Sequence, residues 1–275
     1  MNSADRAERT PASERWAMWW WRISETARIG YREHRAEEPW KITFTTRWPR
    51  ALLQCLFFTM IGRVVGGADG QAYTFVGSVA IIMTLFAMSI TDVPIRDRWN
   101  ATFYRLRSSR LPVPMIYIIR SWPAAVEAAA AAASCIVVVG VATGQAALAL
   151  QLLQVIPIYV LMAFTVSAAA LAAASAGLFG RAGNDIIVGN LGQYLIIACS
   201  GALIPPGRVA WLDAVGSILP TRHGIQAIHH YLAGEPWLAD VRTEVVVGAA
   251  WLTAAIVLYS ALTRRVRHTD HDKVT

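Results

Sequence analysis

Long apolar runs constrain this chain more than any other feature. Stretches of about twenty mainly apolar residues recur along it, and a helix of that length crosses ~30 Å of hydrocarbon. Only 16% of the 275 residues are charged and 55% are hydrophobic, whereas about a quarter of an ordinary soluble domain is charged. A secreted disulfide scaffold, a disordered tail and a cytosolic enzyme are therefore poor fits. The sequence predicts an all-α, polytopic integral membrane protein.

Six of these runs are predicted to be transmembrane helices. The fourth run is longer than one span requires. Pro157 is expected to bend it, because an interior proline removes a helix hydrogen bond. The predicted spans are residues 51–65, 72–91, 123–143, 147–178, 186–204 and 244–263. The chain is then one transmembrane domain of residues 1–275, with an N-terminal region (1–48), a six-span core (49–263) and a tail (264–275).

The distribution of Lys and Arg predicts the orientation of these spans. An even number of spans puts both termini on one side, and 21 of the 25 basic residues lie on that side. Because cytoplasmic loops are enriched in Lys and Arg, both termini are expected in the cytoplasm, in a multi-pass protein of the cell membrane. The net charge of +7 then reflects orientation, and no nucleic-acid partner is expected.

An amphipathic helix is predicted between residues 13 and 35. At 100° per residue its apolar side chains project within ~120° of one another, and arginines occupy the opposite side. A helix with tryptophans on its apolar edge suits the headgroup region of a bilayer, lying flat. Packing on the protein's own spans is the alternative. The apolar residues are Trp16, Trp19, Trp20, Ile23, Ala27 and Tyr31.

The loop after the second span contains another predicted helix, at residues 94–107. Asp92 and Pro94 form a helix start, because proline is preset for the first turn and needs no N–H partner there. Exposed aromatic residues among charges are typical of a surface that docks into a partner groove; contact with lipid or with the chain's own spans is the alternative. One face carries Ile95, Trp99, Phe103 and Leu106, with Asp97, Arg98, Asn100, Arg105 and Arg107 around the rest.

Residues 205–242 are predicted to form two short helices on the external side. The first ends at Pro220, and Thr221 is expected to cap the second, which Gly234 closes. Apolar helices in this position usually fold back into the outer leaflet, where backbone is tolerated if it stays helical or buried in protein.

Sequence motifs of catalysis and nucleotide binding are missing from the chain. Its two lysines, Lys41 and Lys273, do not follow the glycine of a phosphate-binding loop, so any ATP must be hydrolysed by another subunit. The motifs HExxH, CxxC and GxSxG are absent, as is an Asp-rich pair for magnesium and pyrophosphate. The three cysteines lie inside apolar runs and are interpreted as apolar filler. No catalytic residue and no bound cofactor are expected.

Two sets of polar residues carry competing interpretations. His223, Gln226 and His230 share one helical face, but no cysteine or carboxylate shares their turns, so a solvated face is favoured over a metal site. Arg63 and Glu127 are ionisable residues inside spans and are functional candidates for that reason. Each is also close enough to a helix end to reach water, and the sequence does not decide between these two readings.

The order of these elements resembles the membrane subunit of a type-2 ATP-binding-cassette (ABC) exporter, the permease class of daunorubicin-type drug exporters and polysaccharide exporters. Six spans with cytoplasmic termini, an N-terminal interfacial helix and a basic helical loop after the second span are typical of that family. The closest local match runs from Ile204-Pro205-Pro206 through Leu219-Pro220-Thr221-Arg222-His223-Gly224 to Gly234.

The resemblance also implies a role for the basic loop, as the helix that couples the permease to its ATPase. Where the family usually has acidic residues followed by Gly-Thr, this chain has Asp97-Arg98-Trp99-Asn100-Ala101-Thr102, with Leu111-Pro112 following. The implied coupling residues are Ile95, Asp97, Arg98, Trp99, Asn100, Thr102, Phe103, Arg105 and Leu106.

As the resemblance implies, two such permease subunits, identical or homologous, assemble with two cytoplasmic ATPase subunits that bind ATP and Mg²⁺. Closure of the ATPases would push on the coupling helix and the interfacial helix and open a path outward. The apolar spans favour a hydrophobic or amphipathic cargo such as a drug, peptide, lipid or glycan. The alternatives are an integral membrane enzyme acting on lipid and a permease or channel that works alone.

Overall fold

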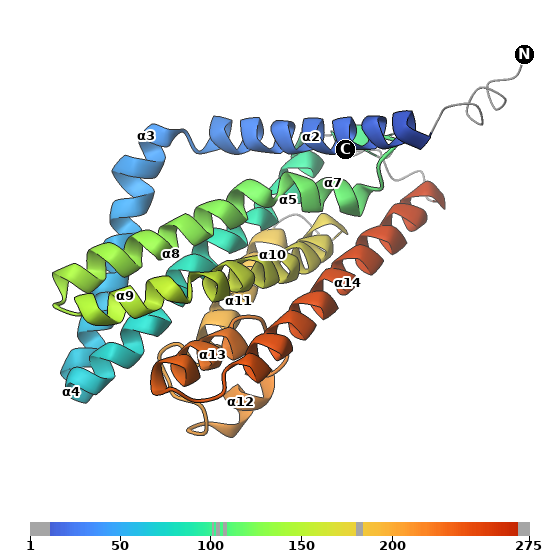
Figure 1. The fold of residues 1–275 in the computed structure, drawn as a ribbon. Helices are drawn as coiled ribbons and strands as arrows, with labels where there is room; N and C mark the ends of the chain where they lie inside the picture. Colours follow the sequence, from blue (N-terminus) through green and yellow to red (C-terminus); the bar gives the residue numbers. More distant parts are fainter. Residues whose placement is uncertain (1–11, 101, 103–104, 107–108, 180–183, 269–275) are drawn as a thin grey trace, which may run out of the picture.

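Every regular element in the computed structural model is a helix within the residues it describes, which are 12–100, 102, 105–106, 109–179 and 184–268. Four stretches are long and apolar enough to cross a membrane: Trp40–Trp99, Val113–Ala142, Ile156–Ser175 and Leu238–Arg264. The prediction of an all-α, polytopic membrane protein is confirmed (Figure 1).

The first two predicted spans form a helical hairpin within α4 (Trp48–Ala87). Gly67 reverses the chain with φ 64° and ψ −146°, a conformation that only glycine adopts easily. Gly62 allows the two arms to touch, because a Cβ there would overlap Thr74. Further along, Ser78 Oγ lies 3.1 Å from Thr59 Oγ1 on the opposite arm.

The third and fourth runs each divide into a shorter and a longer helix. α7 (Val113–Arg120) leads into α8 (Trp122–Ala142), and α9 (Ala146–Gln154) leads into α10 (Ile156–Phe179). The bend expected at Pro157 is present just before it, because Val155 leaves the helix with φ −97° and ψ 14°.

Helix α10 lies at the centre of the bundle and contacts α4, α8, α11 and α14. α11 (Asn184–Cys199) has 16 residues, about 24 Å of helix at ~1.5 Å per residue. α14 (Leu238–His268) begins six residues before the predicted sixth span. Between them lie the two predicted external helices, α12 (Ala210–Gly216) and α13 (Arg222–Ala233).

Helix α2 (Ala12–Glu37) lies across one end of this bundle (Figure 1). The chain turns at Pro39 and enters the first span through α3 (Trp40–Ile42) and a π-helix, η1 (Thr43–Arg47). At the same end, η2 (Met88–Thr91) leads from α4 into α5 (Asp92–Trp99).

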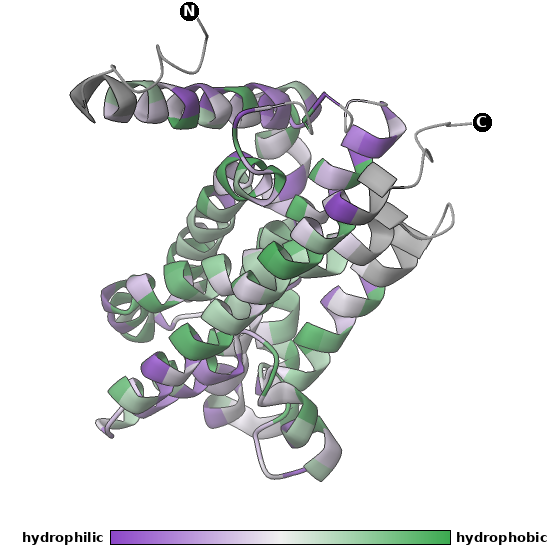
Figure 2. Ribbon diagram, turned by 90° about the vertical axis from the view of Figure 1, so that its right-hand side faces the viewer, coloured by the Kyte–Doolittle hydropathy of each residue, from purple (hydrophilic) through white to green (hydrophobic). Residues whose placement is uncertain are grey.

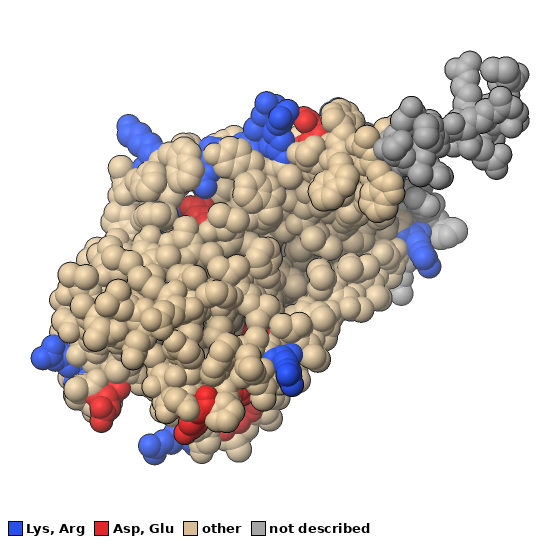
Figure 3. All heavy atoms as spheres, viewed as in Figure 1, with Lys and Arg blue, Asp and Glu red and all other residues tan. Residues whose placement is uncertain are grey.

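The surface of the bundle is apolar between two charged ends. Figure 2 shows mostly hydrophobic residues along the long helices, and Figure 3 shows Lys, Arg, Asp and Glu gathered near the top and bottom of a broad uncharged band. Large apolar side chains of the long helices are exposed, for example Leu53 (66%) and Val246 (66%). Monomeric soluble proteins rarely expose large contiguous apolar patches, so this surface is suited to lipid.

Candidate coupling site

Helix α5, which contains the first four of the nine predicted coupling residues, is shorter than expected. The predicted helix over residues 94–107 stops at Trp99, and Asn100 has φ −83° and ψ 4°. The Thr102 amide donates to the Asp97 carbonyl at 2.9 Å, and Thr102 Oγ1 donates to Asp97 Oδ1 at 2.9 Å. Local side-chain bonds of this kind compete with the helical ladder, which explains the early end.

The predicted apolar face of this segment is not one continuous surface. Trp99 is 69% exposed at the end of α5, whereas Ile95 is half-buried and Leu106 packs partly against the core. Arg98 is half-buried and Arg105 is exposed. Phe103 lies outside the described residues.

Asp97 does not belong to the charged outer face that its position in the sequence suggests. It is only 7% exposed, and Arg120 donates to its two carboxylate oxygens, from NH1 at 2.6 Å and from NH2 at 3.3 Å. Charged hydrogen bonds with this two-pronged geometry are among the strong ones. Asp97 is therefore an internal anchor of α5, and its predicted role in coupling stays a prediction.

The same arginine also holds helix α2. Arg120 Nε and NH2 donate to Glu33 Oε2 at 2.9 and 2.5 Å. Gly30 faces the Arg120 backbone so closely that a Cβ there would lie 2.7 Å from Arg120 Cα. Arg96 of α5 pairs directly with Glu37 of α2. Helices α5, α7 and α2 thus meet at one buried guanidinium.

A second charged cluster surrounds Glu127, near the start of α8. Its Oε2 lies 2.5 Å from His34 Nε2, 3.4 Å from Arg35 NH2 and 3.6 Å from Arg47 NH1, and Glu38 also pairs with Arg47. The Glu127 side chain is 5% exposed, so it is held inside the protein. The cluster joins α2, the π-helix before the first span, and α8.

This cluster also has the residue types of a metal site. The ligand atoms of His34, Glu38 and Glu127 lie within 4.8 Å of one another. Arg35 and Arg47 occupy the same cluster and neutralise its two carboxylates without an ion. The contacts therefore support ion pairing between helices as the role of these residues.

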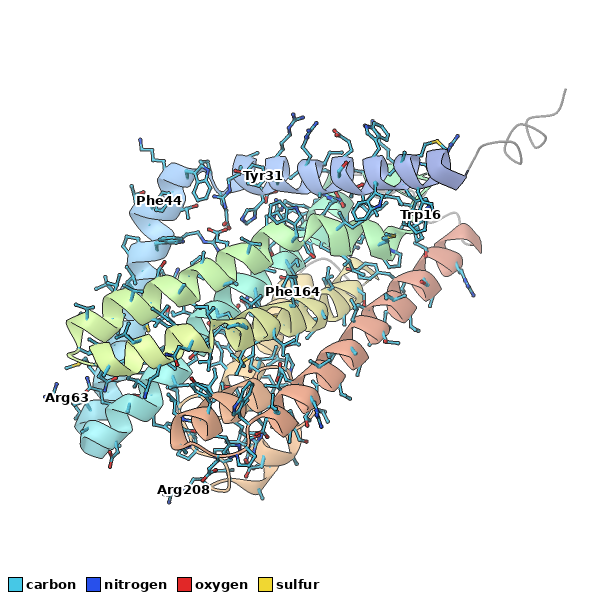
Figure 4. All side chains as sticks on the ribbon, viewed as in Figure 1. Trp16, Tyr31, Phe44, Arg63, Phe164 and Arg208 are labelled. Carbon is cyan, nitrogen blue, oxygen red and sulfur yellow. The ribbon has the colours of Figure 1, made fainter. Side chains whose placement is uncertain are left out.

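The predicted interfacial residues divide between packing and exposure. Ile23 is half-buried, and Tyr31 stacks on Trp122 with ring centroids 6.0 Å apart. Trp16 (68%), Trp19 (42%) and Trp20 (65%) are exposed, and Figure 4 shows Trp16 on the side of α2 that faces the spans. The helix both packs on α7 and α8 and leaves tryptophans open at the level where headgroups would lie.

A cavity of about 490 Å³ opens beside the coupling site, among α4, α5 and α11. Its lining combines charged side chains of both signs with Trp99 and with polar residues of α11. The charged residues are Glu38, Arg47, Asp92 and Arg96, and the polar ones are Asn190 and Gln193. This mixture of apolar and polar walls lies at the cytoplasmic end that the charge distribution predicts.

The other predicted site residues lie at the opposite end of the molecule. Arg63 and Arg208 point outward there (Figure 4), so Arg63 and Glu127 do not share a site. Pro205 is exposed in the loop before α12, and His223 Nε2 lies 3.1 Å from the Ser217 carbonyl.

The start of α13 differs from the prediction. Thr221, which follows Pro220, has φ 81°, and its side chain makes no capping bond. Glu244 of α14 takes that role: it is fully buried and accepts hydrogen bonds from the Thr221 and Gly224 amides at 3.0 and 3.1 Å. A carboxylate is the stronger acceptor at a helix N-terminus, where the dipole also favours it. Gly234 closes α13 in the left-handed conformation, as predicted.

Two further groups at the end of the molecule opposite α2 have perturbed pKa values. The hydrogen bond from Arg222 holds the pKa of Asp213 below its usual range. Burial, with a smaller effect from His230, lowers the pKa of His229 to about 4. The His229 ring stacks on Tyr73 with centroids 4.5 Å apart, so it packs as a neutral ring.

A sequence profile of a known family matches most of the residues that form this architecture. Residues 32–232 match the family described as ABC-2 type transporter. The chain belongs to the ABC-2 type transporter family. This match confirms the resemblance found in the sequence. A search of curated proteins finds no match. In this ABC-2 transporter subunit, the matched region includes α5, Arg120, Glu127 and α11.

Sequence reasoning missed three residues of this ABC-2 transporter subunit that organise its two ends. Arg120 was visible only as one of six basic residues in a loop, and Glu33 as one acid in an amphipathic helix. Glu244 stands at the start of the sixth apolar run, after Asp240 and Arg242. A charge at the border of an apolar run is a signal for a buried pair, but it does not name the partner.

Proposed function

We propose that this ABC-2 transporter subunit exports a hydrophobic or amphipathic substrate from the cytoplasm or the inner leaflet. Separate ATPase subunits, which bind ATP and Mg²⁺, supply the energy. Two permease subunits, identical or homologous, and two ATPase subunits form the complex in the cell membrane, with both termini in the cytoplasm. The observation that carries this proposal is Arg120, which ties α5 and α2 to the start of the third span.

In this proposal α5 receives the movement of the ATPase. Trp99 is the exposed contact, at 69% exposure, and exposed Trp side chains are frequent hot spots of binding. The Asp97–Arg120 pair passes a displacement of α5 to α7 and α8, and the Arg120–Glu33 pair passes it to α2. The coupling role thus divides into an exposed docking residue and buried anchors.

The cavity among α4, α5 and α11 supports an amphipathic cargo. Its charged side chains can face a polar headgroup while Leu85 and Met88 face an apolar part. It opens beside α5, so movement of that helix changes its shape. Drugs, peptides, lipids and glycans with an apolar portion all have this combination of surfaces.

Copurification tests the docking assignment. The full chain is co-expressed with an ABC ATPase subunit of the same organism, and the Trp99→Ala variant is expected to retain much less ATPase than the unaltered chain. Trp211→Ala is the matched control, because Trp211 is 62% exposed at the external end. Equal retention by the two variants would show that Trp99 does not dock the ATPase.

Transport tests the function itself. Inverted vesicles that hold both subunits should accumulate a lipophilic fluorescent dye when ATP is added. A variant ATPase that cannot hydrolyse ATP should abolish the uptake. Equal uptake by vesicles that contain this chain without any ATPase would instead establish a permease that works alone.

A further inference from the structure

An apolar groove opens on the outer face of the bundle between α8 and α14, with α10 as its floor. Its volume is about 340 Å³, within the range of about 300–1,000 Å³ that is typical of ligand pockets. The three helices belong to stretches that are long and apolar enough to cross a membrane. The groove therefore faces the hydrocarbon of the bilayer and lies away from the coupling site.

Small residues on neighbouring helices create the hollow. Ala125 of α8, Ala168 of α10 and Ala249 of α14 line it, together with Phe164, which is 53% exposed. Gly248 brings α14 onto α10, because a Cβ there would overlap the Thr165 side chain. The hollow is thus a product of close helix packing beneath it.

The polar side chains of the lining are all engaged within the protein. Ser121 Oγ donates to the Ile118 carbonyl at 2.6 Å, and Ser167 Oγ donates to the Ala163 carbonyl at 2.7 Å. Thr165 Oγ1 lies 2.5 Å from Glu244 Oε1. No charged side chain lines the groove in the described part of the chain. The groove therefore presents hydrocarbon and recognises an alkyl chain better than a polar ligand.

Trp122 lines the groove at the end nearest helix α2 and connects the groove to that helix. Its indole N–H donates to the Ala27 carbonyl at 3.1 Å, and its ring stacks on Tyr31 at a 17° interplanar angle. An occupant that enters from the bilayer thus begins at the level of α2, where headgroups would lie, and runs inward past Trp122.

We propose that the groove binds one acyl chain of a bilayer phospholipid, with the headgroup at the level of α2. The acyl chain moves from one hydrocarbon environment, the bilayer, into another, the groove. Its binding is therefore stabilised by close van der Waals contact, in a gap that bulk lipid fills poorly. This site is separate from the cargo cavity at α5, and it does not depend on the proposed function.

Photocrosslinking of the full chain in phosphatidylcholine vesicles tests the proposal. The probe is a phosphatidylcholine with a diazirine in one acyl chain, and adducts are located by peptide mass spectrometry. Adducts on α10 around Phe164 should exceed, several-fold, those at Val257, which is 59% exposed on α14 outside the groove. Equal labelling at the two positions would overturn the proposal.

Groove-filling variants provide the specific control. Ala249→Phe should reduce the α10 adducts several-fold, whereas Ala250→Phe, on the adjacent exposed position outside the lining, should leave them unchanged. If Ala249→Phe does not fold, Val245→Trp fills the groove from a 48% exposed position, with Val246→Trp as its control. Undiminished adducts in a folded groove-filling variant, or crosslinks to a second copy of the chain in place of lipid, would refute acyl-chain binding.

Discussion

Neutralising Asp97 tests whether this residue is an anchor inside the permease or a contact for a partner. Its side chain is 10% exposed and that of Arg120 is 7% exposed. The Asp97→Asn variant would leave the buried guanidinium with Glu33, whose side chain is 45% exposed. Removing one partner of a buried ion pair costs about 3–5 kcal/mol. The permease alone should therefore lose stability, without any ATPase present.

The stability loss expected for Asp97→Asn can be compared with the loss expected on removing a neighbouring charge. Taking the lower end, about 3 kcal/mol, and about 2–4 °C per kcal/mol for a chain of this size, Asp97→Asn should lower the thermal midpoint by about 6–12 °C. Arg98→Gln, one residue away and only half-buried, should cost about 1 kcal/mol or less. The assay is thermal unfolding of the purified permease in detergent.

A double variant separates the energy of the Asp97–Arg120 interaction from the other effects of each substitution. Asp97→Asn combined with Arg120→Gln removes both charges, so it should cost less than the sum of the single variants, with a coupling of about 0.5–3 kcal/mol. The anchor role of Asp97 is refuted if the stability losses of the two single variants simply add in the double variant. It is also refuted if Asp97→Asn shifts the thermal midpoint no more than Arg98→Gln. In either case Asp97 does not anchor α5 through Arg120.

Two further predictions concern the end of the molecule opposite α2. Glu244→Ala would leave the Thr221 and Gly224 amides without their acceptor, at a cost of about 1–3 kcal/mol for each buried group; a thermal midpoint equal to that of Glu235→Ala, an exposed acid nearby, would contradict this. The pKa of His229 is lowered to about 4 from an unfolded value of ~6.5. The stability that a neutral His229 contributes is therefore complete above pH ~6.5 and is lost as the pH falls to about 4, by about 3 kcal/mol in total. Thermal unfolding from pH 7.5 to 4.5 should show a smaller pH dependence for His229→Gln than for the unaltered chain, and identical slopes would count against a buried neutral ring.

Patterns that depend on neighbouring residues were predictable from the sequence. Apolar runs predicted the long helices, Pro157 marked the bend between α9 and α10, and Gly234 marked the end of α13. In each case the physical cause lies within a few residues of its effect. The amphipathic helix at residues 13–35 was predictable for the same reason.

Features that depend on distant partners were not predictable. Arg120 pairs with residues 23 and 87 positions away in the chain, and Glu244 receives its bonds from residues 20 to 79 positions away. Periodicity placed Asp97 on the outer face because it registers only the order of polar and apolar residues. It also extended the coupling helix past Trp99, where the Thr102–Asp97 bonds end it.

Buried charges hold several helices together at each of the two ends of the permease, and helix α10 contacts helices at both ends. At one end α5 can move away from α7 or α2 only by breaking the bonds of Arg120, which costs several kcal/mol. At the other end Glu244 fixes α13 to α14 and, through Thr165, to α10. Helix α10 also contacts α5 and η2. Helix α10 is therefore in contact with helices of both clusters.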